Sequence, residues 1–179
     1  KVKLMRCHQR PEWAHVRLYL TVEGVSTGII PGDDSPFEIQ ANFMKHLVIF
    51  RNGNGKVVTF TLQDGLSVME FYKQFMRGLE EIGSPTAINV RAQEFYDPID
   101  FDKDTKHHHY DKEAVQLWHQ NHLFAHEALR GFLSGFRGKV DGPAYYFGTM
   151  DLTGIVYSGE SAPFGMNKPI SDHAFDERY

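Results

Sequence analysis

The sequence has very little cysteine, no long apolar run and no block of like charge. Its one cysteine, Cys7, cannot form a disulfide within the chain, and small secreted domains usually carry an even set of cysteines. The apolar runs are too short to cross a bilayer, and the first residues lack the pattern of a signal peptide. We therefore predict a cytoplasmic protein that has no membrane partner.

Lysine and arginine nowhere cluster, and the net charge is −4. Neutralising phosphates requires clustered cations, so the sequence predicts no nucleic-acid partner. The phosphate-binding GxxxxGKS, dinucleotide-binding GxGxxG and nucleophile-elbow GxSxG patterns are also missing. We predict no cofactor, and these absences leave open whether the protein is an enzyme.

The chain is nevertheless long and apolar enough to bury a core. Its 179 residues are 41% hydrophobic and include 14 Phe and 8 Tyr, which favours one packed domain over residues 1–179. The first residue is Lys rather than Met, which leaves open that native residues at the ends are missing.

The first third of the sequence alternates apolar and polar residues with the period of half-buried strands. This pattern covers Val16–Val22, Phe37–Phe43 and Val58–Leu62, and Leu47–Phe50 is a short apolar run between the last two. Asn52–Gly55 contains residues that tolerate a positive φ angle, which is typical of a hairpin turn. These segments predict an antiparallel meander.

A helical period follows. Ser67 and Glu70 match a capping box, and apolar residues at helical spacing continue to about Ile82. Residues from about Ala87 to Phe95 then predict a further strand.

A second, longer helix is predicted from a cap at Asp111 or a neighbouring residue to about Arg137. Residues 143–157 then predict either a final strand pair or one long edge strand. The predicted fold class is α+β, an antiparallel sheet with two main helices packed on one face.

The densest polar cluster lies in the loop before the long helix. A histidine among carboxylates can act as a general base. The acids could also bind a hard cation, but the calcium-binding EF-hand pattern is absent. The alternative is a solvated loop whose side chains form local turns and a helix cap. Asp151 is a further candidate because it interrupts an apolar strand. The candidate pocket residues are Asp102, Asp104, His107, Tyr110, Asp111 and Asp151.

Three histidines of the long helix, His119, His122 and His126, share one face at spacings of three and four. Imidazole is a common zinc ligand, so these residues are the alternative candidates for a metal site. On a helical projection they border an apolar stripe through Trp118 and Phe132, and a cation there would meet Arg130. We therefore predict no metal site.

Several segments resemble a known family. FDKDTKHHHYD resembles the F-D-x-D-T-x-H-x-x-Y-D pattern of an uncharacterised bacterial domain-of-unknown-function family. GTMDLTGIVYSGESAP is similar to its G-S-F-D-L…F-S-G-R-x-A-P segment, and HVRLYLTVEGVSTGIIP and FEIQANFMKHLVIF are similar to its early strands.

The resemblance implies no known activity, cofactor or substrate. The matched polar positions add Thr105, Ser158 and Gly159 to the six candidate residues. Glu160 stands where the family pattern has Arg and Tyr145 where His is common, which argues against an anion site at these positions. The family usually continues beyond the position of Tyr179.

Three hypotheses about function remain. The first is a small-molecule binding or regulatory domain with a polar pocket between the sheet and the 102–111 loop. The second is a hydrolase or metal-assisted enzyme that uses the loop residues with Asp151. The third is a homo-oligomer assembled through the aromatic strand at Tyr145–Phe147.

Overall fold

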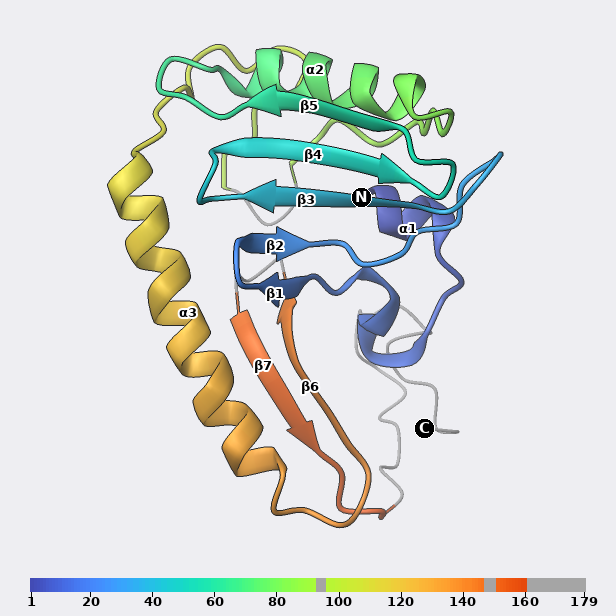
Figure 1. Ribbon diagram of the computed structural model, residues 1–179, viewed down its shortest axis with the longest axis vertical. Helices are drawn as coiled ribbons and strands as arrows, with labels where there is room; N and C mark the ends of the chain where they lie inside the picture. The colour runs from blue at the N-terminus through green and yellow to red at the C-terminus, as the bar shows by residue number, and fades with distance from the viewer. Residues whose placement is uncertain (93–95, 147–150, 161–179) are drawn as a thin grey trace.

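The computed structural model describes residues 1–92, 96–146 and 151–160. A five-stranded antiparallel sheet has the order β1-β2-β3-β4-β5, and β6 and β7 form a separate hairpin (Figure 1). The strands are β1 (Tyr19–Thr21), β2 (Gly24–Ser26), β3 (Phe37–Asn42), β4 (Leu47–Asn52), β5 (Val57–Thr61), β6 (Val140–Tyr146) and β7 (Asp151–Val156). The helices are α1 (Val2–Arg6), the 3₁₀-helix η1 (Pro11–Val16), α2 (Val68–Glu81) and α3 (Lys112–Leu133).

The predicted meander is confirmed, because strands that are neighbours in sequence are neighbours in the sheet. At the predicted turn, Asn52 Oδ1 accepts hydrogen bonds from the amides of Asn54 and Lys56, and Gly55 has φ +83°. The strand predicted over Val16–Val22 is instead shorter and is followed by a second strand, β2, which begins at Gly24. A Cβ at Gly24 would lie 1.9 Å from the Ala41 carbonyl oxygen, so glycine is required where β2 pairs with β3.

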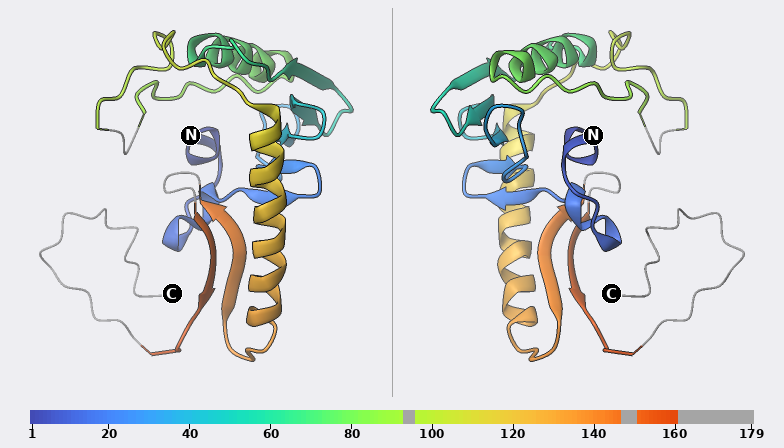
Figure 2. Two further views of the ribbon diagram at one scale, coloured as in Figure 1. Left: turned by 90° about the vertical axis from the view of Figure 1, so that its left-hand side faces the viewer. Right: turned by 90° about the vertical axis from the view of Figure 1, so that its right-hand side faces the viewer.

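Helix α2 packs at the β5 end of the five-stranded sheet (Figures 1 and 2). Ser67 Oγ accepts a hydrogen bond from the Glu70 amide at 3.2 Å, which confirms the predicted N-cap. Between the helix and the sheet, Leu79 of α2 and Phe50 of β4 are fully buried in the main apolar core. A Cβ at Gly78 would lie 2.6 Å from the Phe50 ring, so this glycine lets α2 approach the sheet closely.

Helix α3 runs along the hairpin and packs against β6, β7 and the edge strand β1 (Figure 1). The α+β class with an antiparallel sheet and two main helices is confirmed, and of the two alternatives for residues 143–157 the structure has the strand pair. The expected placement of both helices on one face differs from the structure, because the hairpin forms a second sheet that α3 covers. No helix within the described residues is long and apolar enough to span a bilayer.

Two contacts join the hairpin to the main sheet. Leu18 and Tyr145 exchange backbone hydrogen bonds of 2.8 and 2.9 Å. Beside them, Arg17 Nη1 lies 2.6 Å from Asp141 Oδ1, and the Arg17 side chain is buried. The hairpin is therefore attached at the outer edge of β1.

The strand predicted over residues 87–95 is not present in its described part, residues 87–92, and residues 93–95 lie outside the described residues. The carbonyl of Val90 accepts a hydrogen bond from the Phe101 amide, and that of Arg91 accepts one from Lys1 Nζ. These backbone groups thus find partners in a loop and a side chain rather than in a neighbouring strand.

Candidate functional site

The Asp104 carboxylate is the centre of the candidate loop. Its Oδ1 accepts hydrogen bonds from the amides of Lys106 and His107, each at 3.1 Å, and its Oδ2 lies 2.8 Å from His107 Nδ1. Burial raises the pKa of Asp104, but the hydrogen bonds from His107 and Lys106 outweigh burial and hold the pKa below its ordinary value. Asp104 is therefore a charged, fully engaged acceptor with an exposed histidine beside it.

This loop also caps helix α2. The first amides of a helix lack partners within it, and the loop supplies them. The Val68 amide donates to the His107 carbonyl at 2.9 Å, and the Met69 amide donates to the Asp104 carbonyl at 2.9 Å. The Asp104–His107 pair thus holds in place a loop that α2 requires.

Tyr110 and Asp111 connect the loop to its neighbours. The Tyr110 hydroxyl lies 3.1 Å from His46 Nδ1, and burial raises the pKa of Tyr110. The Tyr110 amide donates to Asp64 Oδ1 at 3.0 Å. Asp111 Oδ1 accepts from the Ala114 amide, so the predicted cap of the long helix is confirmed. That helix ends at Leu133, earlier than the predicted Arg137.

The remaining candidates lie apart from this pair. Asp102 is exposed in the turn before Asp104. Asp151 is exposed on β7, where it pairs with Tyr146 and acts through its charge on Tyr145, whose pKa is raised mainly by burial. Thr105, Ser158 and Gly159 are also exposed. No contact recorded among the described residues joins Asp151 to the loop, and a shared catalytic or ligand site for these residues stays a prediction.

The three helix histidines each have a separate partner. His119 Nε2 donates to the Thr21 carbonyl at 2.8 Å, and His122 Nδ1 donates to the Trp118 carbonyl at 2.9 Å. His126 Nδ1 lies 3.2 Å from Glu127 Oε1. In the part of the chain that the structure describes, no group of three or more His, Cys, Asp or Glu side chains is arranged to hold a metal ion.

The helix is also turned relative to the projected stripe. His119, placed at the edge of that stripe, is 1% exposed, whereas Phe132, placed within it, is 64% exposed. The physical reason is the surface of the same chain against which α3 packs. The edge strand offers the Thr21 carbonyl to an imidazole N–H, and the ring of Phe43 packs edge-on against His119.

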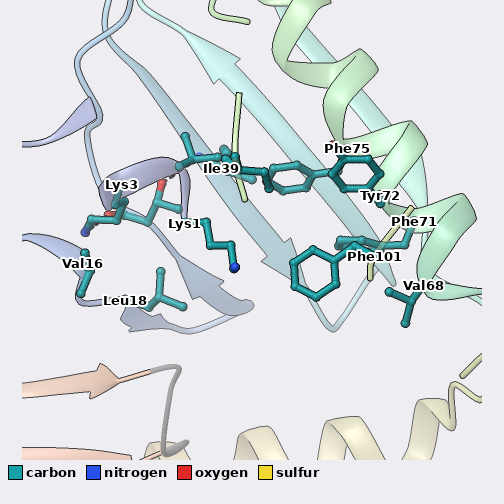
Figure 3. A pocket seen from close by; sticks show the side chains of 13 residues that line it. Lys1, Lys3, Val16, Leu18, Ile39, Val68, Phe71, Tyr72, Phe75 and Phe101 are labelled. Carbon is teal, nitrogen blue, oxygen red and sulfur yellow. Dashed lines mark hydrogen bonds between the residues drawn. The ribbon is translucent and has the colours of Figure 1, made fainter. Parts of the chain in front are cut away.

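An apolar cavity of about 510 Å³ lies between α1, strand β3 and the face of α2 that points toward the sheet (Figure 3). None of the six candidate residues lines it. The lining residue nearest to the 102–111 loop in sequence is Phe101, which directly precedes that loop. Its lining is Lys1, Val2, Lys3, Val16, Leu18, Thr27, Ile39, Val68, Phe71, Tyr72, Phe75, Ile88 and Phe101.

Little in the sequence indicates this cavity. Phe71 and Phe75 were recognisable as the apolar side of a helix, but nothing local indicates that they face a cavity rather than closed packing. The one available signal is Lys3, a charged residue within the apolar segment that begins at Val2. In α1, both Val2 and Lys3 are buried.

Comparison with known proteins gives a family but no named relative. No curated protein and no solved structure matches the chain significantly. The match of residues 1–178 to DUF5996, a family of unknown function, confirms the resemblance to an uncharacterised family, and the chain belongs to that family.

Proposed function

We propose that this protein binds a small, largely apolar molecule in the cavity between α1, β3 and α2. One observation carries the proposal, namely a cavity of about 510 Å³ with an almost entirely apolar lining. Ligand pockets typically enclose roughly 300–1,000 Å³ and present mostly apolar and aromatic side chains with a few polar groups. The cavity has this composition, with aromatic side chains from α2 and a few polar residues, Lys1, Lys3 and Thr27.

Packing supports the same proposal. Protein interiors are normally filled to the density of organic crystals, so an apolar space of this size forgoes contacts that a closed core would make. Phe71 and Phe75 already pack against other rings on the side facing Phe50 and Phe60. A ligand in the cavity would supply apolar contacts on their other side.

The proposal differs in place and polarity from the pocket predicted by the sequence. That pocket was polar and adjoined the 102–111 loop, whereas this cavity is apolar and involves Phe101 alone among residues next to the loop. The hydrogen bonds of Asp104 account for its polarity without a ligand.

The test uses the neutral fluorescent probe N-phenyl-1-naphthylamine, whose emission rises and shifts to the blue in apolar sites. We expect saturable binding to the full chain. Val68→Trp fills the cavity from the first turn of α2 and should weaken binding about tenfold or more, as loss of the site predicts. Val22→Trp is the matched control, because Val22 is 83% exposed in the turn after β1.

A second cavity-filling variant guards against misfolding. Ile88→Trp changes a lining residue on an irregular segment, and circular dichroism and the unfolding midpoint test whether this variant folds. Wild-type affinity in both folded cavity variants, or no saturable binding to the wild type, overturns the proposal.

A further inference from the structure

Two lysine side chains, those of Lys1 and Lys3, are among the lining of the otherwise apolar cavity. Lys3 is 7% exposed, and its Nζ donates to the carbonyl of Thr27 at 2.7 Å and to the carbonyl of Arg17. Lys1 reaches from the start of α1 toward Phe101, with its Nζ 5.3 Å from the centre of that ring (Figure 3). The same Nζ donates to the Arg91 carbonyl.

Neither ammonium group has a carboxylate partner within the described ranges. The partners recorded for both are neutral carbonyls and aromatic rings, including the Tyr19 ring 5.0 Å from Lys3 Nζ. Lys3 is the buried one of the two. Burying an ammonium group without an opposite charge is costly, and carbonyl dipoles compensate it only in part. Burial accordingly lowers the pKa of Lys1 and that of Lys3; for Lys3, the charge of Cys7 opposes burial and the charge of Arg17 adds to it.

The nearby charges do not cancel this excess. Arg17 is satisfied by Asp141, and Asp100 is engaged by Lys103 at 2.9 Å and by Arg91 at 3.8 Å. The cavity therefore combines a large apolar wall on α2 with two lysines, Lys1 just before α1 and Lys3 within it. A molecule that fits both has an apolar body and one anionic end.

We propose that the ligand of this cavity is a small organic acid whose apolar body packs against α2 and whose carboxylate pairs with the ammonium groups of Lys1 and Lys3. This inference rests on the proposed function and specifies the chemical class of its ligand. The geometry allows it, because Lys3 uses two carbonyls as acceptors and an ammonium group has three N–H donors.

The experiment compares two soluble compounds that share one body, 4-phenylbutanoate and 4-phenylbutan-1-ol. Each is titrated against the full chain by displacement of N-phenyl-1-naphthylamine and by calorimetry. We expect the acid to bind at least about tenfold more tightly than the alcohol, since a charge-assisted pair replaces a neutral contact.

Variants assign this difference to the lysines. Lys1→Met keeps an apolar stem of similar length and should weaken the acid about tenfold while leaving the alcohol unchanged. Lys3→Met is a second variant, used after its unfolding curve establishes that it folds. Lys56→Met is the matched control, because Lys56 is an exposed residue of the β4–β5 turn that does not line the cavity.

The outcomes separate this inference from the function beneath it. If the neutral probe binds and the two compounds displace it equally, the acid inference is overturned while the apolar site stands. A tenfold preference that survives in both folded Lys→Met variants overturns it as well. If the neutral probe does not bind to the wild type, the proposed function fails and the acid inference falls with it.

Discussion

The main sheet with α1 and α2 and the hairpin with α3 are built differently. The first, here the sheet–α2 region, contains Phe50, Ile30 and Leu79 at 0% exposure. Among the described residues of the second, the hairpin–α3 region, the largest fully buried side chain is that of His119, and Phe124 is 80% exposed. Buried apolar area is the main source of folding free energy, so the two regions should differ in local stability.

The connection between the regions has a similar polar character. Arg17 and Asp141 pair at the junction, Leu18 bonds to Tyr145, and His119 donates to the Thr21 carbonyl. Each contact is directional, and together they fix how the hairpin meets β1. The first region therefore relies mainly on packing, whereas the second combines a smaller buried set, Leu133, Ala144 and Tyr145, with a few specific polar contacts.

The largest expected effect comes from truncating the core of the sheet–α2 region. Phe50→Ala removes a fully buried ring that packs against Phe60 and Phe75, and it should lower the free energy of unfolding by about 4 kcal/mol. Urea unfolding followed by circular dichroism measures the change. The matched control is Phe132→Ala in α3, where the ring is 64% exposed and the loss should be below about 1 kcal/mol.

Equal losses in the two variants would show that α3 contributes as much packing as α2 and would remove the contrast between the regions. A larger loss for Phe132→Ala would reverse it.

The second prediction concerns the junction. Asp141→Asn leaves the buried Arg17 guanidinium without its carboxylate, and removal of one partner from a buried pair typically costs several kcal/mol. Because the Asp141 side chain is 30% exposed, we expect roughly 2 kcal/mol. Hydrogen exchange should locate the effect, with faster exchange at the Leu18 and Tyr145 amides and little change at the amides of β4.

The control is Asp33→Asn, which removes the carboxylate from a pair with Arg6 whose acid is 59% exposed. Solvent already screens that pair, so little change in stability is expected. Uniform acceleration of exchange across both regions in Asp141→Asn would mean that they unfold as one unit.

The sequence predicted the sheet–α2 region more successfully, and the reason is local. The Asn52 turn, the Ser67 cap and strand alternation depend on residues a few positions apart. The Asp111 cap of α3 is equally local and was also predicted. The contact between Asp104 and His107, three residues later, is also local. A local turn was one of the two interpretations of this loop.

The features that sequence reasoning missed depend on distant segments. The exposure of Phe132 and the burial of His119 follow from the narrow surface that the hairpin and β1 offer to α3. The cavity needs α1, β3 and α2 together, and the periodicity of Phe71 does not distinguish a cavity wall from closed packing. Tertiary contacts therefore determine the site, while local patterns determine most of the elements around it.

The smallest expected effect concerns the solvent-exposed side of α3. Phe124→Ser replaces a ring that is 80% exposed, so the free energy of unfolding should change by no more than about 0.5 kcal/mol at low protein concentration. Sedimentation velocity at several concentrations accompanies the unfolding curves. If the outer face of α3, with Leu117 and Phe124, is covered by a second copy of the chain, the wild type will sediment as a dimer and its unfolding midpoint will rise with concentration. In that case the serine variant will sediment as a monomer, and its unfolding midpoint will not depend on concentration. The weak packing of the hairpin–α3 region will then be a feature of the isolated chain alone, because association would bury the apolar side chains that α3 leaves exposed within its own fold.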